Sequence, residues 1–107
     1  MTEHNMELRS FLDGGISPYH TVAQASEYLN AQGFTPLPLG GKFDIRRGGR
    51  YYVENGTFLA AFTVGEENVF HVAASHTDWP CLRIKPQPEQ LAGGCLKLSV
   101  ETYGGAI

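Results

Sequence analysis

The chain has 107 residues, enough for one small domain and too few for two. Its 8 basic and 11 acidic residues give a net charge of −3, which argues against a nucleic-acid partner bound through its phosphate backbone. No apolar run approaches the roughly 18 residues of a membrane-spanning helix, so no membrane partner is expected either.

The N-terminal segment, Met1–Ser10, is polar and acidic, unlike a secretory signal or an Arg-rich transit peptide. We therefore expect a cytoplasmic protein in which Cys81 and Cys95 are reduced thiols. Residues 1–7 are expected to form a flexible tail. The last residues, Thr102–Ile107, bring no charged or polar tail, and we expect residues 1–107 to be a single, partial domain.

Two helices are predicted first. One covers roughly Met6–Leu12. The other has Ser17 at its N-cap, Pro18 at its first helical position and Gly33 just past its end. Its apolar stripe has the spacing i, i+3, i+4 and i+7 and consists of Val22, Ala25, Ser26 and Leu29.

The next segment, Thr35–Leu39, contains two prolines and is expected to be an extended edge strand. The loop after it, Gly40–Gly49, mixes glycines with basic residues. A phosphate-binding loop would need a strand before it and a helix after it, whereas a hairpin follows here. We therefore expect a solvated loop, and a nucleotide-binding domain is only a third, weaker hypothesis.

The hairpin is predicted around Asn55-Gly56, a pair that tolerates the two positive φ angles of a type I′ turn. This turn sets Val53 opposite Phe58. One face of the hairpin then carries Tyr51, Val53, Phe58, Ala60, Phe62 and Val64.

The segment Val69–Ser75 is apolar on both faces except at His71, as in a central strand that is covered on both sides. Two further strands are expected at Cys81–Lys85 and Cys95–Glu101, with a loop at Pro86–Gly94 between them. The sequence thus predicts an α/β fold in which N-terminal helices precede a mixed β-sheet. The helices cover one face, and nothing in the sequence covers the other.

Polar residues follow the predicted central strand, where open α/β sheets place their sites. His76 and Asp78 are two residues apart, on the same side of an extended chain. They suggest a metal-binding imidazole whose second N–H is accepted by the carboxylate. They also fit a polar turn in which Asp78 bonds to backbone, and one imidazole falls short of the three or four ligands of a zinc site.

His20 lies in the first turn of the second helix, where the helix dipole favours a neutral ring. It would contact a substrate anion or a partner subunit, or bond locally at the helix end.

Several segments together resemble the M18 aspartyl aminopeptidase family, and its bacterial members most of all. The resemblance covers nearly the whole chain from Leu8 onward. The segments are Phe11–Asp13, Ser17–Val22, Ala73–Asp78, Pro80–Lys85 and Val100–Gly105. The resemblance implies the N-terminal part of a three-layer α/β/α zinc-peptidase catalytic domain.

The resemblance also implies a metal-dependent aminopeptidase that removes N-terminal, preferentially acidic, residues from peptide substrates. The family uses two divalent metal ions, usually zinc, and forms a closed homo-oligomer, a dodecamer. By position, His76 resembles its first metal ligand and Asp78 the catalytic carboxylate that supports the centre. His20 falls in a matching segment and is assigned a possible substrate or interface role. The implied reaction is attack of a metal-activated water on the scissile carbonyl.

This sequence departs from the family at Trp79, where the family usually has Ser. The remaining metal ligands and the general base of the family would lie beyond Ile107. We therefore expect at most one zinc ligand in this chain and no activity from the chain alone. The alternative, from another functional class, is a non-catalytic α/β module for oligomer assembly or peptide binding.

Overall fold

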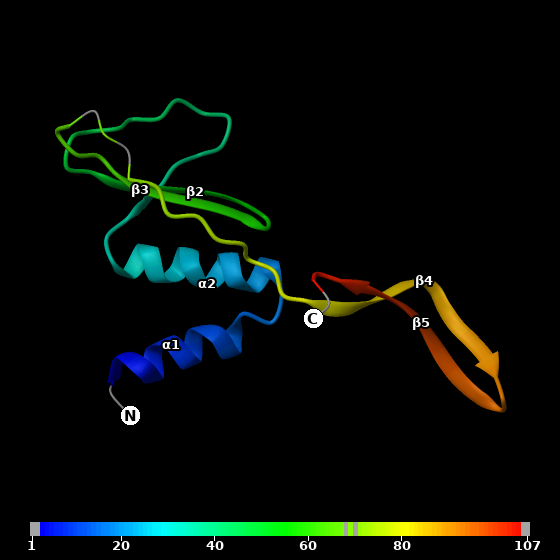
Figure 1. Ribbon diagram of the computed structural model, residues 1–107. Helices are drawn as coiled ribbons and strands as arrows, with labels where there is room; N and C mark the ends of the chain where they lie inside the picture. The colour runs from blue at the N-terminus through cyan, green and yellow to red at the C-terminus, as the bar shows by residue number, and fades with distance from the viewer. Residues whose placement is uncertain (1–2, 68, 70, 106–107) are drawn as a thin grey trace.

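The structure is a computed structural model that describes residues 3–67, 69 and 71–105 (Figure 1). Two helices come first in the chain and are followed by five strands. The helices are α1 (Glu3–Gly14) and α2 (Pro18–Ala31), and the strands are β1 (Thr35–Pro36), β2 (Arg50–Asn55), β3 (Phe58–Thr63), β4 (Cys81–Ala92) and β5 (Cys95–Tyr103).

Both predicted helices are confirmed. Ser17 is the N-cap of α2, with extended backbone (φ −151, ψ 164), and its side chain accepts a hydrogen bond from the backbone N–H of His20. Gly33 follows the helix with φ 80, a conformation that favours glycine. Helix α1 starts earlier than expected, so residues 3–7, assigned above to a tail, form its first turns.

The predicted mixed sheet is present as a three-stranded sheet. Strand β1 pairs with β2 in parallel, and β2 pairs with β3 in antiparallel orientation. Helix α2 packs on this sheet and α1 packs on α2, so both helices lie on the same side of the sheet (Figure 1). We call α1, α2 and β1–β3 the body. Its buried apolar residues are Val22 on α2 and Tyr51 and Tyr52 on β2.

The hairpin register differs from the prediction by two residues. Val53 pairs with Ala60 rather than Phe58, and Asn55 continues the strand opposite Phe58. Gly56 (φ 61) is then the first central residue of the turn, as in a type II′ turn. Because side chains alternate with period two, a shift of two residues keeps the predicted apolar face.

The loop predicted at Pro86–Gly94 is wrong, because β4 runs through most of it. Strands β4 and β5 form a long antiparallel ribbon that turns at Gly93 and Gly94 (φ 60 and 74), the two positive φ angles of a type I′ turn. The prolines lie where the ladder is irregular, between Ile84 and Glu89. Proline has no N–H for a ladder, which explains the interruption there.

The central strand predicted at Val69–Ser75 is also wrong. Residues 69 and 71–75 are exposed and belong to no strand, while residues 68 and 70 lie outside the described residues. A central strand needs a neighbour on each edge and a layer on each face. The part of the chain that the structure describes supplies neither.

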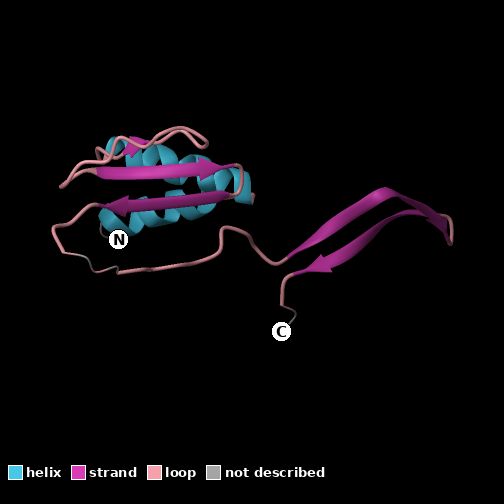
Figure 2. Cartoon of the chain, turned by 90° about the horizontal axis from the view of Figure 1, so that it is seen from above, coloured by secondary structure: helices cyan, strands magenta, loops and turns pink. Residues whose placement is uncertain are grey.

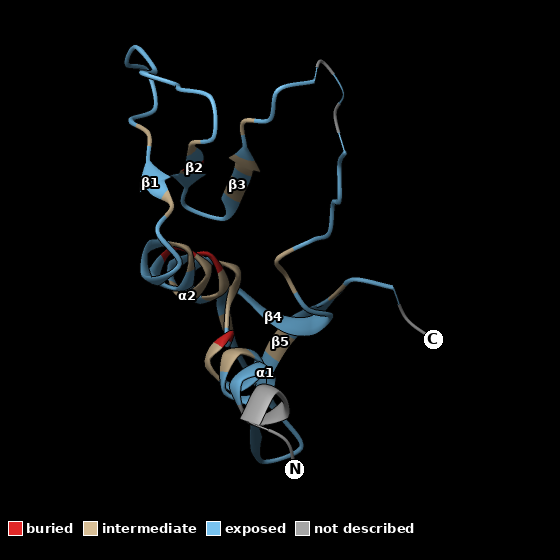
Figure 3. Cartoon of the chain, turned by 90° about the vertical axis from the view of Figure 1, so that its left-hand side faces the viewer, coloured by how far each residue is buried: buried red, intermediate tan, exposed pale blue. Residues whose placement is uncertain are grey.

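The ribbon extends away from the body (Figure 2). The radius of gyration is 19.5 Å, whereas a compact chain of this length has about 13 Å. The accessible surface is 9106 Å², against about 5,900 Å² for a compact monomer of this mass. Figure 3 shows the buried residues where α2 meets the sheet and at the junction of the helices, while the ribbon is mostly exposed.

The ribbon is amphipathic. Directly paired residues share a face, and one face collects six exposed aliphatic side chains. They are Leu82, Ile84, Leu91, Leu96, Leu98 and Val100. A two-stranded ribbon with an uncovered apolar face is at best marginally stable in water, so this face is suited to packing against another layer.

Candidate functional site

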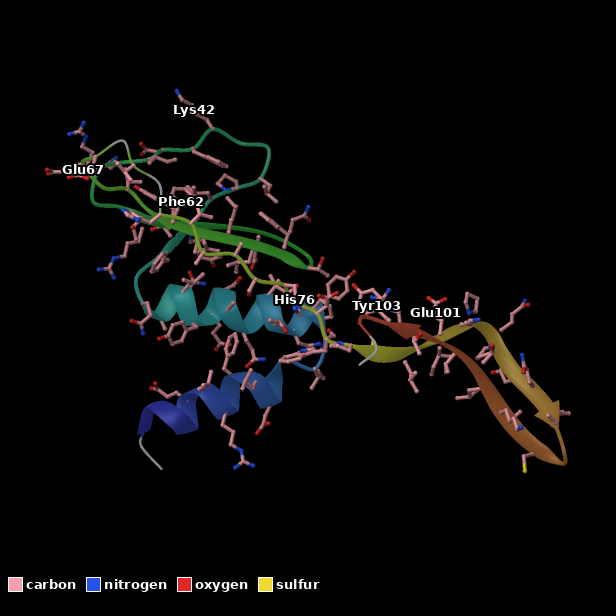
Figure 4. All side chains as sticks on the ribbon, in the orientation of Figure 1. Lys42, Phe62, Glu67, His76, Glu101 and Tyr103 are labelled. Carbon is pink, nitrogen blue, oxygen red and sulfur yellow. The ribbon has the colours of Figure 1, made fainter. Side chains whose placement is uncertain are left out.

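Residues 71–75, which we call the extended segment, lead into the loop His76–Trp79, which we call the junction loop. Strand β4 begins shortly after it, at Cys81. The junction loop therefore connects the body with the ribbon. Figure 4 places His76 beside the end of α2 and near Tyr103, which lies at the end of β5.

The structure brings His76 and Asp78 together, as expected from their spacing. The Nδ1 atom of His76 is 3.3 Å from Oδ1 of Asp78 and 2.8 Å from the Asp78 carbonyl oxygen. Both neighbours are acceptors, so we assign the ring proton to Nδ1. In the neutral ring, Nε2 then keeps a free lone pair, and the His76 side chain is 79% exposed.

The second carboxylate oxygen of Asp78 accepts a hydrogen bond from a residue of the ribbon. The Tyr103 hydroxyl donates a hydrogen bond to Oδ2 of Asp78. This bond is the main cause that lowers the pKa of Asp78 and raises the pKa of Tyr103, because it favours the carboxylate and the protonated phenol. The guanidinium carbon of Arg83 lies 3.4 Å from the centroid of the Tyr103 ring, within cation–π range.

Two further bonds tie the junction loop to the body. The Thr77 hydroxyl donates to the carbonyl of Thr57, in the β2–β3 turn, at 3.0 Å. The Trp79 indole N–H donates to the carbonyl of Gly15, between the two helices, at 2.7 Å. With the Tyr103 bond, the loop is fixed from three different parts of the fold.

A groove of about 1120 Å³ lies beside the junction loop. Both helices, β3 and the extended segment supply its mostly apolar wall. The ionisable groups that line it are His76, Asp78, Arg83 and Tyr103. A largely apolar cleft with a few convergent polar groups is the usual form of a small-ligand or peptide site.

His20 does not join this cluster. Its Nδ1 atom lies 2.7 Å from the hydroxyl of Ser17, so the ring bonds to the cap of its own helix. It is absent from the residues that line the groove.

The described residues fit one position of a zinc site and do not complete it. His76 offers a free Nε2, and Asp78 holds the other ring nitrogen, as carboxylates do for zinc-bound imidazoles. Nowhere in residues 3–67, 69 and 71–105 do three His, Cys, Asp or Glu side chains gather closely enough to bind a metal. A zinc site takes three or four protein ligands.

The contributions of Tyr103 and Arg83 were missed from the sequence. Tyr103 is 25 residues from Asp78, and no local spacing connects them. The connection is made by the ribbon register: Tyr103 pairs with Cys81, and Cys81 begins β4 two residues after Trp79. Extending the predicted strands back from a turn at Gly93 and Gly94 would set Tyr103 opposite Ile84 instead, because the spacing does not reveal the register shift between Ile84 and Glu89.

Comparison with known proteins agrees with the geometry. The family described as aminopeptidase I zinc metalloprotease (M18) matches residues 11–107. A probable M18 family aminopeptidase 2 from Pseudomonas putida strain KT2440 is 40% identical over 108 residues, covering 96% of this chain and 25% of the relative. The corresponding protein of Pseudomonas paraeruginosa strain PA7 is also 40% identical, over 110 residues, with 98% and 26% covered.

A solved structure is similar as well. The cryo-EM structure of the Ape4 and Nbr1 complex contains a chain with a TM-score of 0.83 and 33% identity, covering 95% of this chain and 21% of that one. The chain thus spans about a quarter of the length of the curated relatives that it matches. The family match over nearly all its residues establishes that the chain belongs to M18, the aminopeptidase I family of zinc metalloproteases.

Proposed function

We propose that this chain is the N-terminal part of a zinc aminopeptidase, in which His76 is a metal ligand and Asp78 holds its ring. The observation that carries the proposal is the contact of His76 Nδ1 with Asp78, which leaves Nε2 free to bind a metal. Family membership supports the zinc and the peptide substrate. Bound zinc in such enzymes polarises the scissile carbonyl and lowers the pKa of a water nucleophile.

In this proposal the remaining ligands of two divalent ions, and the general base, come from residues outside this chain. The chain alone is then inactive, because one imidazole with its supporting carboxylate cannot hold a dinuclear centre. The preference for acidic N-terminal residues is carried over from the family resemblance. The groove beside the junction loop is the proposed place where the substrate approaches.

The proposal includes a cytoplasmic location and assembly into a homo-oligomer. Cys81 and Cys95 are both free and exposed, which suits a reducing compartment. No described helix is long and apolar enough to cross a membrane. The exposed apolar face of the ribbon supports packing against further protein, within the same chain or between subunits.

The second candidate is a non-catalytic module for assembly or peptide binding. The incomplete metal set and the uncovered ribbon favour it, since both are compatible with a segment that only packs and binds. Unlike the enzyme, such a module needs no free Nε2 on His76.

A hybrid enzyme distinguishes the two candidates. Residues 11–107 would replace the matching quarter of the Pseudomonas putida relative, and zinc content and aminopeptidase activity would be measured. We expect an active hybrid, and loss of more than about 100-fold in activity or zinc affinity on His76→Ala. His71→Ala, in an exposed histidine of the preceding segment, is the matched control and should change neither. A hybrid that is active and keeps its zinc and its rate after His76→Ala would contradict the proposal.

A further inference from the structure

We infer that Tyr103 is a positioning residue for His76, acting through Asp78 across the junction between ribbon and body. The inference rests on the proposed function, because it assigns a partner to the proposed metal ligand. Tyr103 lines the groove beside the junction loop, and its hydroxyl donates a hydrogen bond to Asp78 rather than to His76.

The two oxygens of the Asp78 carboxylate have different partners. Oδ2 of Asp78 accepts from the Tyr103 hydroxyl, while Oδ1 faces Nδ1 of His76 at 3.3 Å. A carboxylate held by one oxygen cannot rotate freely about its terminal torsion. Its other oxygen therefore stays directed at the imidazole. Together with the Asp78 carbonyl oxygen, which lies 2.8 Å from the same Nδ1, it orients the ring and favours the Nδ1–H tautomer.

Tyr103 is itself held in place by contacts within the ribbon. Its backbone pairs with Cys81 at the base of the ribbon, and the Arg83 guanidinium stacks on its ring at 3.4 Å. Next to it, Gly104 has φ 99 and lies so close to Pro80 that an added Cβ would come within 2.9 Å of the Pro80 Cα. The phenol is thus fixed on a strand end rather than on a mobile loop, as a positioning group requires.

Through the Tyr103 bond, the ribbon becomes part of the site. The other two bonds of the junction loop, from Thr77 and Trp79, reach the body. Of these three hydrogen bonds, the Tyr103 bond is the one that reaches the ribbon. A change in how the ribbon sits on the body would therefore move the Asp78 carboxylate first. The orientation of the His76 ring would change with it.

The test is the tautomer of His76, read from its ¹⁵N ring shifts in the 107-residue chain at a pH where imidazole is neutral. Wild type should show mainly the Nδ1–H form. Tyr103→Phe removes only the hydroxyl and should shift the ratio about three- to fivefold towards the Nε2–H form, which a free side chain prefers. Asp78→Asn should shift it at least as far.

The matched control is Tyr51→Phe, which removes a hydroxyl in the body that accepts a bond from the backbone N–H of Arg46 at 3.0 Å. It should leave the His76 ratio unchanged. An unchanged ratio in Tyr103→Phe would overturn the inference whether or not Asp78→Asn shifts it, because the Asp78 carbonyl oxygen would then suffice to set the tautomer.

A measurement on the wild-type chain covers the case in which Tyr103→Phe fails to fold. The Tyr103 hydroxyl proton should be protected from exchange and visible by NMR, whereas that of the exposed Tyr28 should not be. A freely exchanging Tyr103 proton would overturn the inference. None of these measurements uses zinc or peptide hydrolysis. The inference can therefore fail while the proposed function stands, and the proposed function can fail while the inference stands.

Discussion

The body buries apolar side chains, whereas the ribbon leaves the side chains of its apolar face exposed. In the body, α2 lies across the sheet and buries Val22, Tyr51 and Tyr52. In the ribbon, two strands carry an apolar face of six residues, and every one of them is exposed. The difference is one of layers: a sheet face is buried only when a second layer packs on it, and within the described residues the ribbon has none.

The comparison also locates the candidate site. The junction loop lies where the two regions meet, and it receives bonds from both. The body therefore supplies the folded support, and the ribbon supplies the residue that orients Asp78. Variants in the body, in the ribbon and at the junction between them should therefore differ in their effects.

Removing a buried aromatic ring from the body should cause the largest loss of stability. Tyr52 is 3% exposed, and Tyr52→Ala should lower the free energy of unfolding by about 3 kcal/mol, measured by urea denaturation of the 107-residue chain. The ribbon counterpart, Leu91→Ala, changes a side chain that is 86% exposed and should alter it by less than about 0.5 kcal/mol. Equal losses would mean that the apolar face of the ribbon is covered in solution.

A side chain at Gly104 should disturb the joint between the two regions. Gly104→Ala combines positive φ with a close approach to Pro80 and should destabilise the joint by about 2 kcal/mol. Trp79 is the only tryptophan, so its fluorescence during urea denaturation reports on the joint. The control, Gly105→Ala, meets no atom within 4 Å and should behave like wild type. Identical curves for both variants would show that Gly104 is not under this constraint.

Loss of the α2 cap should have a smaller effect, confined to the body. Ser17→Ala removes the acceptor for the His20 N–H and should cost about 1 kcal/mol in urea denaturation followed by circular dichroism. Ser17→Asp keeps an acceptor at the N-cap and should retain most of the stability. If Ser17→Asp loses as much stability as Ser17→Ala, the hydroxyl of Ser17 acts in some way other than capping.

The smallest effect is expected from pH. The Tyr103 bond lowers the Asp78 pKa below its ordinary 3.8, so this bond is present above that value and is lost as the pH falls through the lowered pKa. The Tyr103 pKa lies above its ordinary 10.0, so the phenol keeps its proton at neutral pH. Tyr103→Phe should raise the Asp78 pKa, measured from its carboxyl ¹³C shift. An unchanged or lower pKa in the variant would disagree with the assigned bond.

Local chemistry made the body predictable from sequence. Ser17 and Gly33 set the limits of α2, and the period-two pattern around Gly56 identified the correct faces of the hairpin even though the register was off by two. The proximity of His76 and Asp78 also followed from their spacing.

Long-range pairing could not be predicted in the same way. The prolines of β4 indicated a loop, yet the strand tolerates them at an irregular point of the ladder. The segment around Ala73 has the composition of a central strand, but strand formation depends on neighbours that composition does not reveal. Tyr103 reaches the site only through the full ribbon register, so the positioning contact was not visible from spacing alone.

We propose that the junction loop provides one zinc ligand with its support, and that the other ligands come from residues outside those described. Titration of zinc into the 107-residue chain, measured by calorimetry, is a direct test. We predict no sub-micromolar binding and no difference between the wild-type chain and His76→Ala. Binding of one zinc per chain at sub-micromolar affinity, abolished by His76→Ala, would contradict the claim.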